Sequence, residues 1–392
     1  MIPRHESFIS KFLASRQYNQ TMPFLLPPPI WVDQPPALEH LARELLSQPR
    51  LAVDTESNSL HAFREQVCLI QFSTPITDYL LDPLDLADLS PLAPLFAAPE
   101  IEKVFHAVEY DLICLKRDFS FEIVNVFDTM QSARILGYTQ VGLDALLGLK
   151  FGLQVDKRYQ KADWAYRPLT AEMLNYARLD THYLLQLRDQ LQVELETAGR
   201  WDLAREEFVR MAKLSGNCKA EVPSWQRVAG AHKLDSRQLA ILKELCDWRG
   251  QTAERLTRPP FKVVDNRRLA AIALAGPERL DEFEGILTEY QRRRFGNEIL
   301  RAVKRGQQAS PVSRPRPVRP RQAVLYRANA LSQWRKNLGQ KLHMDSDIIL
   351  PKGWMQAIAE QNPPSLEELA ALMPDSPWRL ENFGEQILKA IH

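Results

Sequence analysis

The stretch RLAVDTES, residues 50–57, decides how the rest of this sequence is interpreted. It begins like a short apolar β-strand, but two acids, Asp54 and Glu56, interrupt the apolar run. Residues two apart on a strand point to the same face of a sheet, so these carboxylates should lie side by side. Neighbouring carboxylates repel each other and are costly to bury. We therefore expect either open solvent or a positive charge between them.

The bulk composition is that of an ordinary globular protein. The chain has 392 residues, of which 45% are hydrophobic and 25% charged, so two or three domains are expected. Its four cysteines lie far apart without a CxxC pair, which argues against a disulfide framework and against a structural zinc site. No signal-peptide pattern and no apolar run of about 18 residues is found. These features predict a cytoplasmic protein.

The first half of the chain predicts one α/β domain over residues 31–215, preceded by a loosely attached extension over residues 1–30. A helical pattern, PPALEHLARELLSQ, is followed by three strand-like runs with short connections, which favours an antiparallel meander: RLAVDT, VCLIQFS and DYLLDP. Strand-like and helical segments then alternate, which is typical of parallel pairing. The last pattern of this half, from Thr170 to Gly199, predicts one long helix.

The second half of the chain predicts two helical modules, at residues 231–310 and 325–392. LCDWRGQTAERL matches LSQWRKNLGQKL at an offset of 86, which pairs Trp248 with Trp334. FGNEILRAV matches FGEQILKAI at an offset of 88. Such self-similarity indicates a repeated structural unit. The repeated tryptophans are more simply core residues than platforms for stacking bases.

The segment between the two modules, residues 311–324, is rich in proline and arginine. The formal net charge of the chain is +1, so the composition as a whole does not indicate a nucleic-acid partner. From Arg301 to Arg321, however, there are seven basic residues and no acid. A solvated, extended linker is one interpretation, and contact with phosphate is a second one that is compatible with it.

Further acids stand where helices are expected. Asp111 lies early in the helical pattern EYDLICLKRDF, and Tyr176 and Asp180 share one helical face because they are four residues apart. Taken singly, each has an ordinary explanation, such as a helix-start acid, a solvated face or a strand end. A cluster of four carboxylates would require divalent cations, and oxygen ligands suit Mg²⁺ or Mn²⁺. Two such ions about 3.5–4 Å apart are suited to displacement at phosphorus.

The order of the motifs DTE, HAVEYD and YARLD resembles the ribonuclease D branch of the DEDD exonuclease superfamily. The stretches CLIQFST, FDTMQSARIL and YQKADWAYRPLT support the resemblance, and the two helical modules are similar to HRDC domains. Together these similarities cover nearly all of the chain beyond residue 30. They imply an α/β exonuclease domain with a ribonuclease H-like mixed sheet and flanking helices, followed by two all-α HRDC-like domains.

The resemblance also implies roles for individual residues. It assigns two divalent ions, Mg²⁺ or Mn²⁺, to four carboxylates, with Asp54 shared by both ions: Asp54, Glu56, Asp111 and Asp180. The third motif matches the DEDDy subgroup, in which the tyrosine, here Tyr176, holds the nucleophilic water. An unperturbed tyrosine has a pKa of about 10, so we expect it to act as a hydrogen-bonding group. Asn175 occupies the position of the histidine in the other subgroup, and His182, off the required face, is expected to be structural or solvated.

Other residues are candidates for lesser roles. Lys161, Trp164 and Arg167 lie in a polar segment before the third motif, where they could bind phosphate and stack on a terminal base. A packing role for Trp164 is left open. Asp128 is expected to cap a helix rather than bind metal.

The resemblance implies a metal-dependent 3′→5′ exoribonuclease that releases nucleoside 5′-monophosphates from RNA with a single-stranded 3′ end. The HRDC-like domains would hold the structured body of the RNA, for example a tRNA precursor. The carboxylates alone indicate only phosphodiester hydrolysis, so a 3′→5′ DNA exonuclease remains an alternative. A catalytically silent nucleic-acid-binding scaffold is a third hypothesis, but such a protein would be expected to lack some of these acids.

Overall fold

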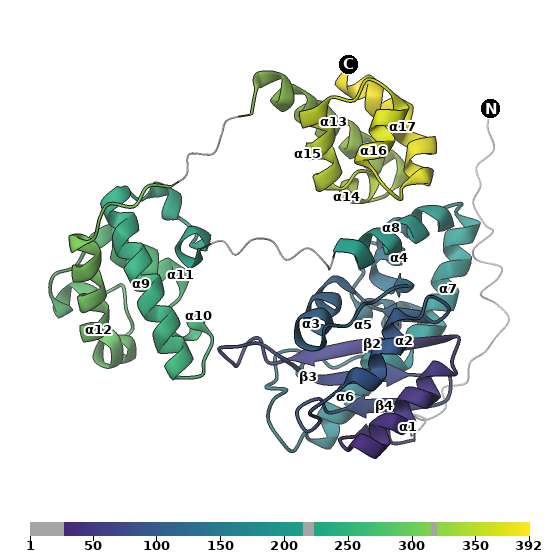
Figure 1. Cartoon of the computed structure of the whole chain (residues 1–392), viewed down its shortest axis with the longest axis horizontal. Helices are drawn as coiled ribbons and strands as arrows, with labels where there is room; N and C mark the ends of the chain where they lie inside the picture. The colour runs from purple at the N-terminus through teal and green to yellow at the C-terminus, as the bar shows by residue number, and fades with distance from the viewer. Residues whose placement is uncertain (1–26, 215–222, 315–319) are drawn as a thin grey trace.

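The computed structural model describes residues 27–214, 223–314 and 320–392. Most of the predicted extension at 1–30, and Arg316 and Arg319 of the predicted linker, lie outside the described residues. Figure 1 shows three units: an α/β domain, a first helical module (α9–α12) and a second helical module (α13–α17). The predicted fold class, a mixed-sheet domain followed by helical modules, is confirmed. No described helix is both long enough and apolar enough to span a membrane.

The sheet has six strands in the order β1-β4-β3-β2-β5-β6. Strands β2, β3 and β4 form the predicted antiparallel meander, and β5 and β6 add parallel strands beside β2. The strand β1, which pairs parallel with β4, was missed by the sequence analysis because three residues after a proline run carry no periodic signal. The bounds are β1 (Ile30–Val32), β2 (Arg50–Ser57), β3 (Val67–Ser73), β4 (Asp78–Leu81), β5 (Glu102–Phe105) and β6 (Val126–Asp128).

Strand β2 is a central strand, and its two ends have different characters. Leu51 and Val53 are fully buried, and burial of such a side chain stabilises the fold by about 1.5–3 kcal/mol. The second half of the strand carries Asp54 and Glu56. The apolar half therefore anchors the strand in the core and holds the acids at its carboxyl end.

The helices of the α/β domain flank this sheet. The prediction of a single long helix after Thr170 is wrong, because the helix is broken at Tyr183 (φ −97°, ψ −2°). Helix α6 packs on β2, β3 and β4, whereas α7 packs on β2, β5 and α4, so the break lets the two halves extend toward different sides of the sheet. The bounds are α1 (Pro35–Leu46), α2 (Ala93–Ala97), α3 (Glu109–Phe119), α4 (Thr129–Leu136), α5 (Leu143–Phe151), α6 (Ala171–His182), α7 (Leu184–Thr197) and α8 (Trp201–Leu214).

The two helical modules repeat one arrangement. In each, the tryptophan of the first long helix contacts a phenylalanine of the last one, with ring centroids 6.0 Å apart for Trp248–Phe295 and 6.1 Å for Trp334–Phe383. The tryptophans thus belong to the module cores, as predicted. The first module comprises α9 (Ser236–Arg255), α10 (Pro260–Val263), α11 (Asn266–Ala275) and α12 (Glu289–Gln308). The second comprises α13 (Gln322–Leu342), α14 (Ser346–Ile349), α15 (Lys352–Gln361), α16 (Leu366–Leu372) and α17 (Pro377–Ile391).

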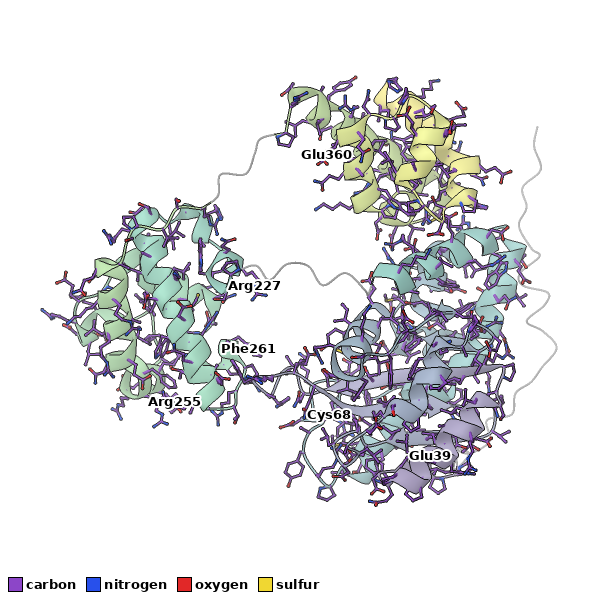
Figure 2. The ribbon with its side chains drawn as sticks, in the orientation of Figure 1. Glu39, Cys68, Arg227, Arg255, Phe261 and Glu360 are labelled. Carbon is purple, nitrogen blue, oxygen red and sulfur yellow. The ribbon has the colours of Figure 1, made fainter. Side chains whose placement is uncertain are left out.

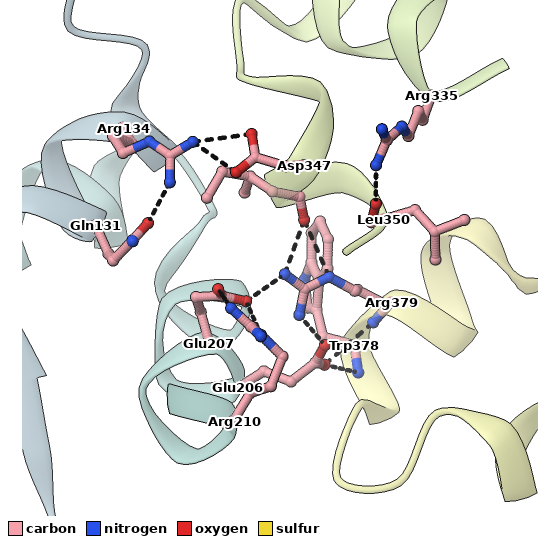
Figure 3. Close-up of polar contacts among 11 residues, drawn as sticks. Gln131, Arg134, Glu206, Glu207, Arg210, Arg335, Asp347, Leu350, Trp378 and Arg379 are labelled. Carbon is pink, nitrogen blue, oxygen red and sulfur yellow. Dashed lines mark hydrogen bonds and ion pairs between the residues drawn. The ribbon is translucent and has the colours of Figure 1, made fainter. Parts of the chain in front are cut away.

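The second helical module is docked firmly on the α/β domain. Figure 3 shows Arg379 of α17 between Glu206 and Glu207 of α8, at 2.6 and 2.8 Å. Arg134 of α4 adds ion pairs to Asp345 and Asp347 at the start of α14. The buried apolar residues of this module also belong to the same continuous core as those of the α/β domain. The module is therefore a structural part of the α/β unit.

The first helical module has a hydrophobic core of its own and a smaller contact with the α/β domain. The contact is made by the β2–β3 connection: Phe63 packs against the module core, and Arg64 forms an ion pair with Glu254 at 3.2 Å. This connection directly follows the two acids of β2, so it links the acidic end of the sheet to the first module.

Candidate active site

Three of the predicted acids lie together where β2 meets α6. Asp54, Glu56 and Asp180 each offer one carboxylate oxygen, and these oxygens lie within 4.8 Å of one another. As predicted, β2 presents its two acids on one face, and α6 covers that face and carries Asp180. Oxygens on one Mg²⁺ ion, at bonds of about 2.1 Å, lie at most about 4.2 Å apart. A small inward rotation of these side chains would therefore let them share one ion.

The fourth predicted acid, Asp111, lies beside this group of three. It is buried in the first turn of α3, and its Oδ1 accepts a hydrogen bond of 2.5 Å from the hydroxyl of Thr55. Thr55 stands between the two acids of β2, with its side chain on the other face. The charge of Asp111 is close enough to raise the pKa of Asp54 and of Glu56. The structure thus brings all four acids to the same end of β2.

The four carboxylates lie close to one another, partly or fully buried, and no basic side chain among the described residues neutralises their charge. Burial, and then the charges of Asp111 and Asp180, raise the pKa of Asp54 well above its usual value. Burial raises the pKa of Asp111 and of Asp180 to about 7. In the part of the chain that the structure describes, no lysine or arginine forms an ion pair with any of the four acids. A site of oxygen ligands that lacks a basic partner suits divalent cations.

Tyr176 stands next to the acids, one helical turn before Asp180. Its ring is buried against Trp164 and Tyr159, with centroids 6.0 and 5.9 Å away. Burial, followed by the charges of Asp180 and Glu56, raises the pKa of the Tyr176 phenol. The phenol therefore stays neutral across the physiological pH range and can donate or accept a hydrogen bond.

One residue beside the acids, Gln71 on β3, was missed by the sequence analysis. It is directly opposite Asp54 in the β2–β3 pair and is 0% exposed. Neither its amide nitrogen nor its amide oxygen has a hydrogen-bond partner among the described residues. The available signal was a lone amide in the apolar run VCLIQFS. Buried amides without a partner are rare in native structures and need an explanation.

The predicted substrate-binding residues fall into different environments. Trp164 is buried among Tyr176 and its neighbours, which favours the packing role that the sequence left open. Arg167 donates to the buried carboxylate of Asp82, at 2.5 and 2.8 Å, and to the carbonyl of Cys68. Its guanidinium is therefore engaged inside the protein. Lys161 is exposed, and its side chain has no partner among the described residues, so it alone of the three is free to reach phosphate.

Two neighbouring predictions are confirmed by hydrogen bonds. Asp128 caps α4 by accepting from the backbone N–H groups of Met130 and Gln131. The same carboxylate also accepts from the N–H groups of Ala107 and Val108, which fixes the start of α3 and so the position of Asp111. His182 binds Asp78 at 2.8 Å, which is a structural role.

Comparisons with known proteins agree with this arrangement. The 3'-5' exonuclease family matches residues 29–196, and the HRDC domain family matches residues 238–303 and 325–391. Protein RRP6-like 1 from Arabidopsis thaliana is 33% identical over 324 residues, which cover 79% of this chain and 51% of that protein. The chain thus spans about half the length of this relative.

Other relatives match over nearly their whole length. Ribonuclease D from Acidiphilium cryptum is 27% identical over 376 residues, which cover 93% of both chains. The crystal structure of Escherichia coli RNase D, described as an exoribonuclease involved in structured RNA processing, is 25% identical with a TM-score of 0.69. That match covers 93% of this chain and 99% of the other.

Proposed function

This chain belongs to the ribonuclease D family, and from that premise we propose that it is a metal-dependent 3′→5′ exoribonuclease. It hydrolyses RNA phosphodiesters from the 3′ end and releases nucleoside 5′-monophosphates. The substrates are cytoplasmic RNAs with a single-stranded 3′ end and a structured body, such as tRNA precursors.

The observation that carries this proposal is the cluster of four acids without a basic partner, beside a neutral phenol. Asp54, Glu56 and Asp180 would hold one divalent ion, Mg²⁺ or Mn²⁺. Asp54 and Asp111 would hold a second one. Two bound ions would supply an activated water and a stabilised leaving oxygen.

The protein's own groups perform the remaining tasks. The hydrogen bond from Thr55 keeps the Asp111 carboxylate turned toward β2. The neutral Tyr176 phenol, one turn from Asp180, orients the attacking water by hydrogen bonding. Lys161, which is exposed next to the tyrosine-bearing helix, contributes a contact with the substrate phosphate.

The choice of RNA over DNA rests on the relatives, since the acids themselves do not distinguish the two. The Acidiphilium relative is named a ribonuclease, and the E. coli structure is described as an exoribonuclease that acts on structured RNA. The intact set of acids argues against a silent scaffold, because no predicted ligand is missing from the site.

The test is a digestion of matched RNA and DNA oligonucleotides, each labelled at either the 5′ or the 3′ end. The expected result is a ladder that shortens from the 3′ end on RNA, requires Mg²⁺ or Mn²⁺, and disappears in Asp54→Asn. A preference for the DNA strand would replace the proposed substrate by DNA. Equal activity in EDTA, or in Asp54→Asn, would refute the mechanism.

A further inference from the structure

The two helical modules expose the equivalent face of their fold to very different surroundings. In the second module this face consists of α14 and the start of α17, and it is docked on the α/β domain. Asp345 and Asp347 pair with Arg134, and the backbone N–H of Trp378 donates to Glu206 at 2.9 Å. The face is therefore an interaction surface in the second module.

In the first module the equivalent face is open. The repeat offset of 86 places Phe261 where the second module has Asp347, and the offset of 88 places Tyr290 where it has Trp378. Phe261 is 49% exposed and Tyr290 is 64% exposed. Two large aromatic side chains thus lie uncovered on the surface that the second module uses to contact the α/β domain.

This open face is also basic, whereas its counterpart carries the acids Asp345 and Asp347. The same offsets place three cations, Arg258, Lys262 and Arg294, where the second module has Met344, Ile348 and Asn382. None of the three cationic side chains forms a hydrogen bond or an ion pair within the described residues. They line a cavity of about 180 Å³ that contains no acid, together with Leu256, Val263, Tyr290 and Phe295.

We propose that this face binds single-stranded RNA, with backbone phosphates held by Arg258, Lys262 and Arg294 and a base stacked on Tyr290. We call it the basic–aromatic face, and define it by these four residues and Phe261. Cationic side chains beside exposed aromatic rings are the combination that single-stranded nucleic acids recognise. The inference rests on the proposed function, because that function makes RNA the substrate.

The position of this face fits an RNA strand that continues to the acids. Glu254, which binds Arg64 of the β2–β3 connection, is only two residues before Leu256 of the cavity. Figure 2 shows Phe261 on the edge of the first module that is nearest to the α/β domain. The same connection starts at the end of strand β2, which carries Asp54 and Glu56. RNA held on the basic–aromatic face would therefore lie on the side of the module that leads to the active site.

The experiment compares a charge variant with a matched control. Arg258→Gln/Lys262→Gln/Arg294→Gln removes three charges from the face. Arg227→Gln/Lys233→Gln/Lys243→Gln removes three exposed charges from other parts of the module, outside the basic run that begins at Arg301. Binding to a labelled single-stranded RNA of about 16 nucleotides is followed by fluorescence anisotropy in EDTA, as a function of salt.

The face variant should lower the slope of log K against log[salt] by about 2, since each phosphate contact on a single strand contributes about 0.7. Tyr290→Ala should weaken binding about tenfold without changing this slope. Both should digest an RNA of about 4 nucleotides, too short to reach the face, at the wild-type rate. The inference is overturned if the face variant and the control lose affinity equally, or if neither does. Failure of wild-type protein to digest any RNA would instead refute the proposed function.

A second, independent inference concerns Gln71. Its neighbours two residues away on β3 both contact α6, because Leu69 packs with Tyr176 and the hydroxyl of Ser73 donates to Thr181 at 2.7 Å. Gln71 therefore faces α6 as well, next to Asp54 on the adjacent strand. The carboxylates of Asp54 and Asp180 accept no side-chain hydrogen bond within the described residues. An unpartnered donor thus lies beside carboxylates that have no side-chain donor.

We infer that Gln71 is a positioning residue, whose amide donates to the Asp54 carboxylate when divalent ions are bound. The test is Mn²⁺ binding, followed by electron paramagnetic resonance without RNA, in Gln71→Met and Gln71→Leu. Both should bind Mn²⁺ at least about tenfold more weakly, as is typical when the partner of a metal ligand is removed. The metal-free variants should unfold at or above the wild-type temperature, since a buried amide without a partner is replaced by an apolar group. Gln131→Met, at a buried glutamine of α4 whose amide oxygen accepts from Arg134, controls for the loss of a buried amide away from the acids. Unchanged Mn²⁺ affinity in a folded variant would overturn the inference.

Discussion

Replacing Arg379 by methionine should destabilise the whole α/β unit, although this residue lies far along the chain in the second helical module. Arg379 is 0% exposed and forms ion pairs with Glu206 and Glu207 at 2.6 and 2.8 Å. It also donates to the carbonyl of Ile348 at 2.8 Å. Methionine preserves the apolar stem but leaves two buried carboxylates without this partner.

The magnitude follows from what these carboxylates retain. Removing one member of a buried ion pair costs about 3–5 kcal/mol. Glu207 keeps its ion pair with Arg210, and Glu206 keeps the backbone N–H groups of Trp378 and residue 379. We therefore expect the lower end, about 3 kcal/mol. For a unit of this size that corresponds to a fall of about 6–12 °C in Tm.

Differential scanning calorimetry of the full chain measures this change. The control is Arg293→Met, since that arginine is 81% exposed in its ion pair with Glu289 and should matter by less than about 0.5 kcal/mol. The double variant Glu206→Gln/Arg379→Met should regain part of the loss, because Glu207 keeps its ion pair with Arg210 and the other buried carboxylate is replaced by a neutral amide. If Arg379→Met melts like the control, the docking of the second module does not stabilise the α/β unit. Because of the same contacts, deletion of residues 310–392 would destabilise the domain that carries the active site. Any loss of RNA binding in that deletion variant would then have two causes.

Three further predictions concern the active site and its surroundings. Without metal, the protein should lose stability as pH rises from 5 to 8, which thermal unfolding in EDTA measures. The pKa values of Asp111 and Asp180 are raised from 3.8 to about 7 in the folded protein. The folded state therefore keeps protons that the unfolded chain has already released, and this stabilisation is lost as pH rises through 7. Added Mg²⁺ should restore stability at pH 8, and a Tm that rises with pH in EDTA would contradict the account. Tyr176→Phe should lower kcat by about 100-fold in steady-state digestion, because the attacking water is no longer oriented, while the affinity for Mn²⁺ stays within about twofold of the wild type. A loss of Mn²⁺ affinity as large as the loss of kcat would instead make the phenol part of the metal site. Arg167→Met should destabilise the fold by about 3 kcal/mol in urea unfolding, because buried Asp82 loses its partner; lower RNA affinity at unchanged stability would restore Arg167 as a substrate contact.

The sequence predicted the features that depend on local periodicity and on short motifs. The spacing of Asp54 and Glu56 placed both on one face of β2, and the four-residue spacing of Tyr176 and Asp180 placed both on α6. Asp128 was predicted as a cap from its place at a strand-to-helix turn. These inferences need only the geometry of one strand or one helix.

The features that the sequence did not predict depend on contacts between distant segments. The break at Tyr183 reflects two different packing surfaces for α6 and α7, which no local pattern encodes. The engagement of Arg167 depends on Asp82, and the docking of the second module depends on Arg379 meeting α8. Gln71 became notable only when its strand neighbour was known to be Asp54. Each of these required the register of the sheet or the packing of the domains.

The most direct test of the central claim is the number of Mn²⁺ ions that the metal-free protein binds, measured by isothermal titration calorimetry without RNA. The account predicts two ions per chain in the wild type, with protons released at pH 6 because raised carboxyl pKa values must be overcome. Asp54→Asn should reduce binding at both positions, since its carboxylate is shared. Binding of Mn²⁺ that is the same in Asp54→Asn as in the wild type, or no binding at all, would contradict the assignment of these acids as a metal site.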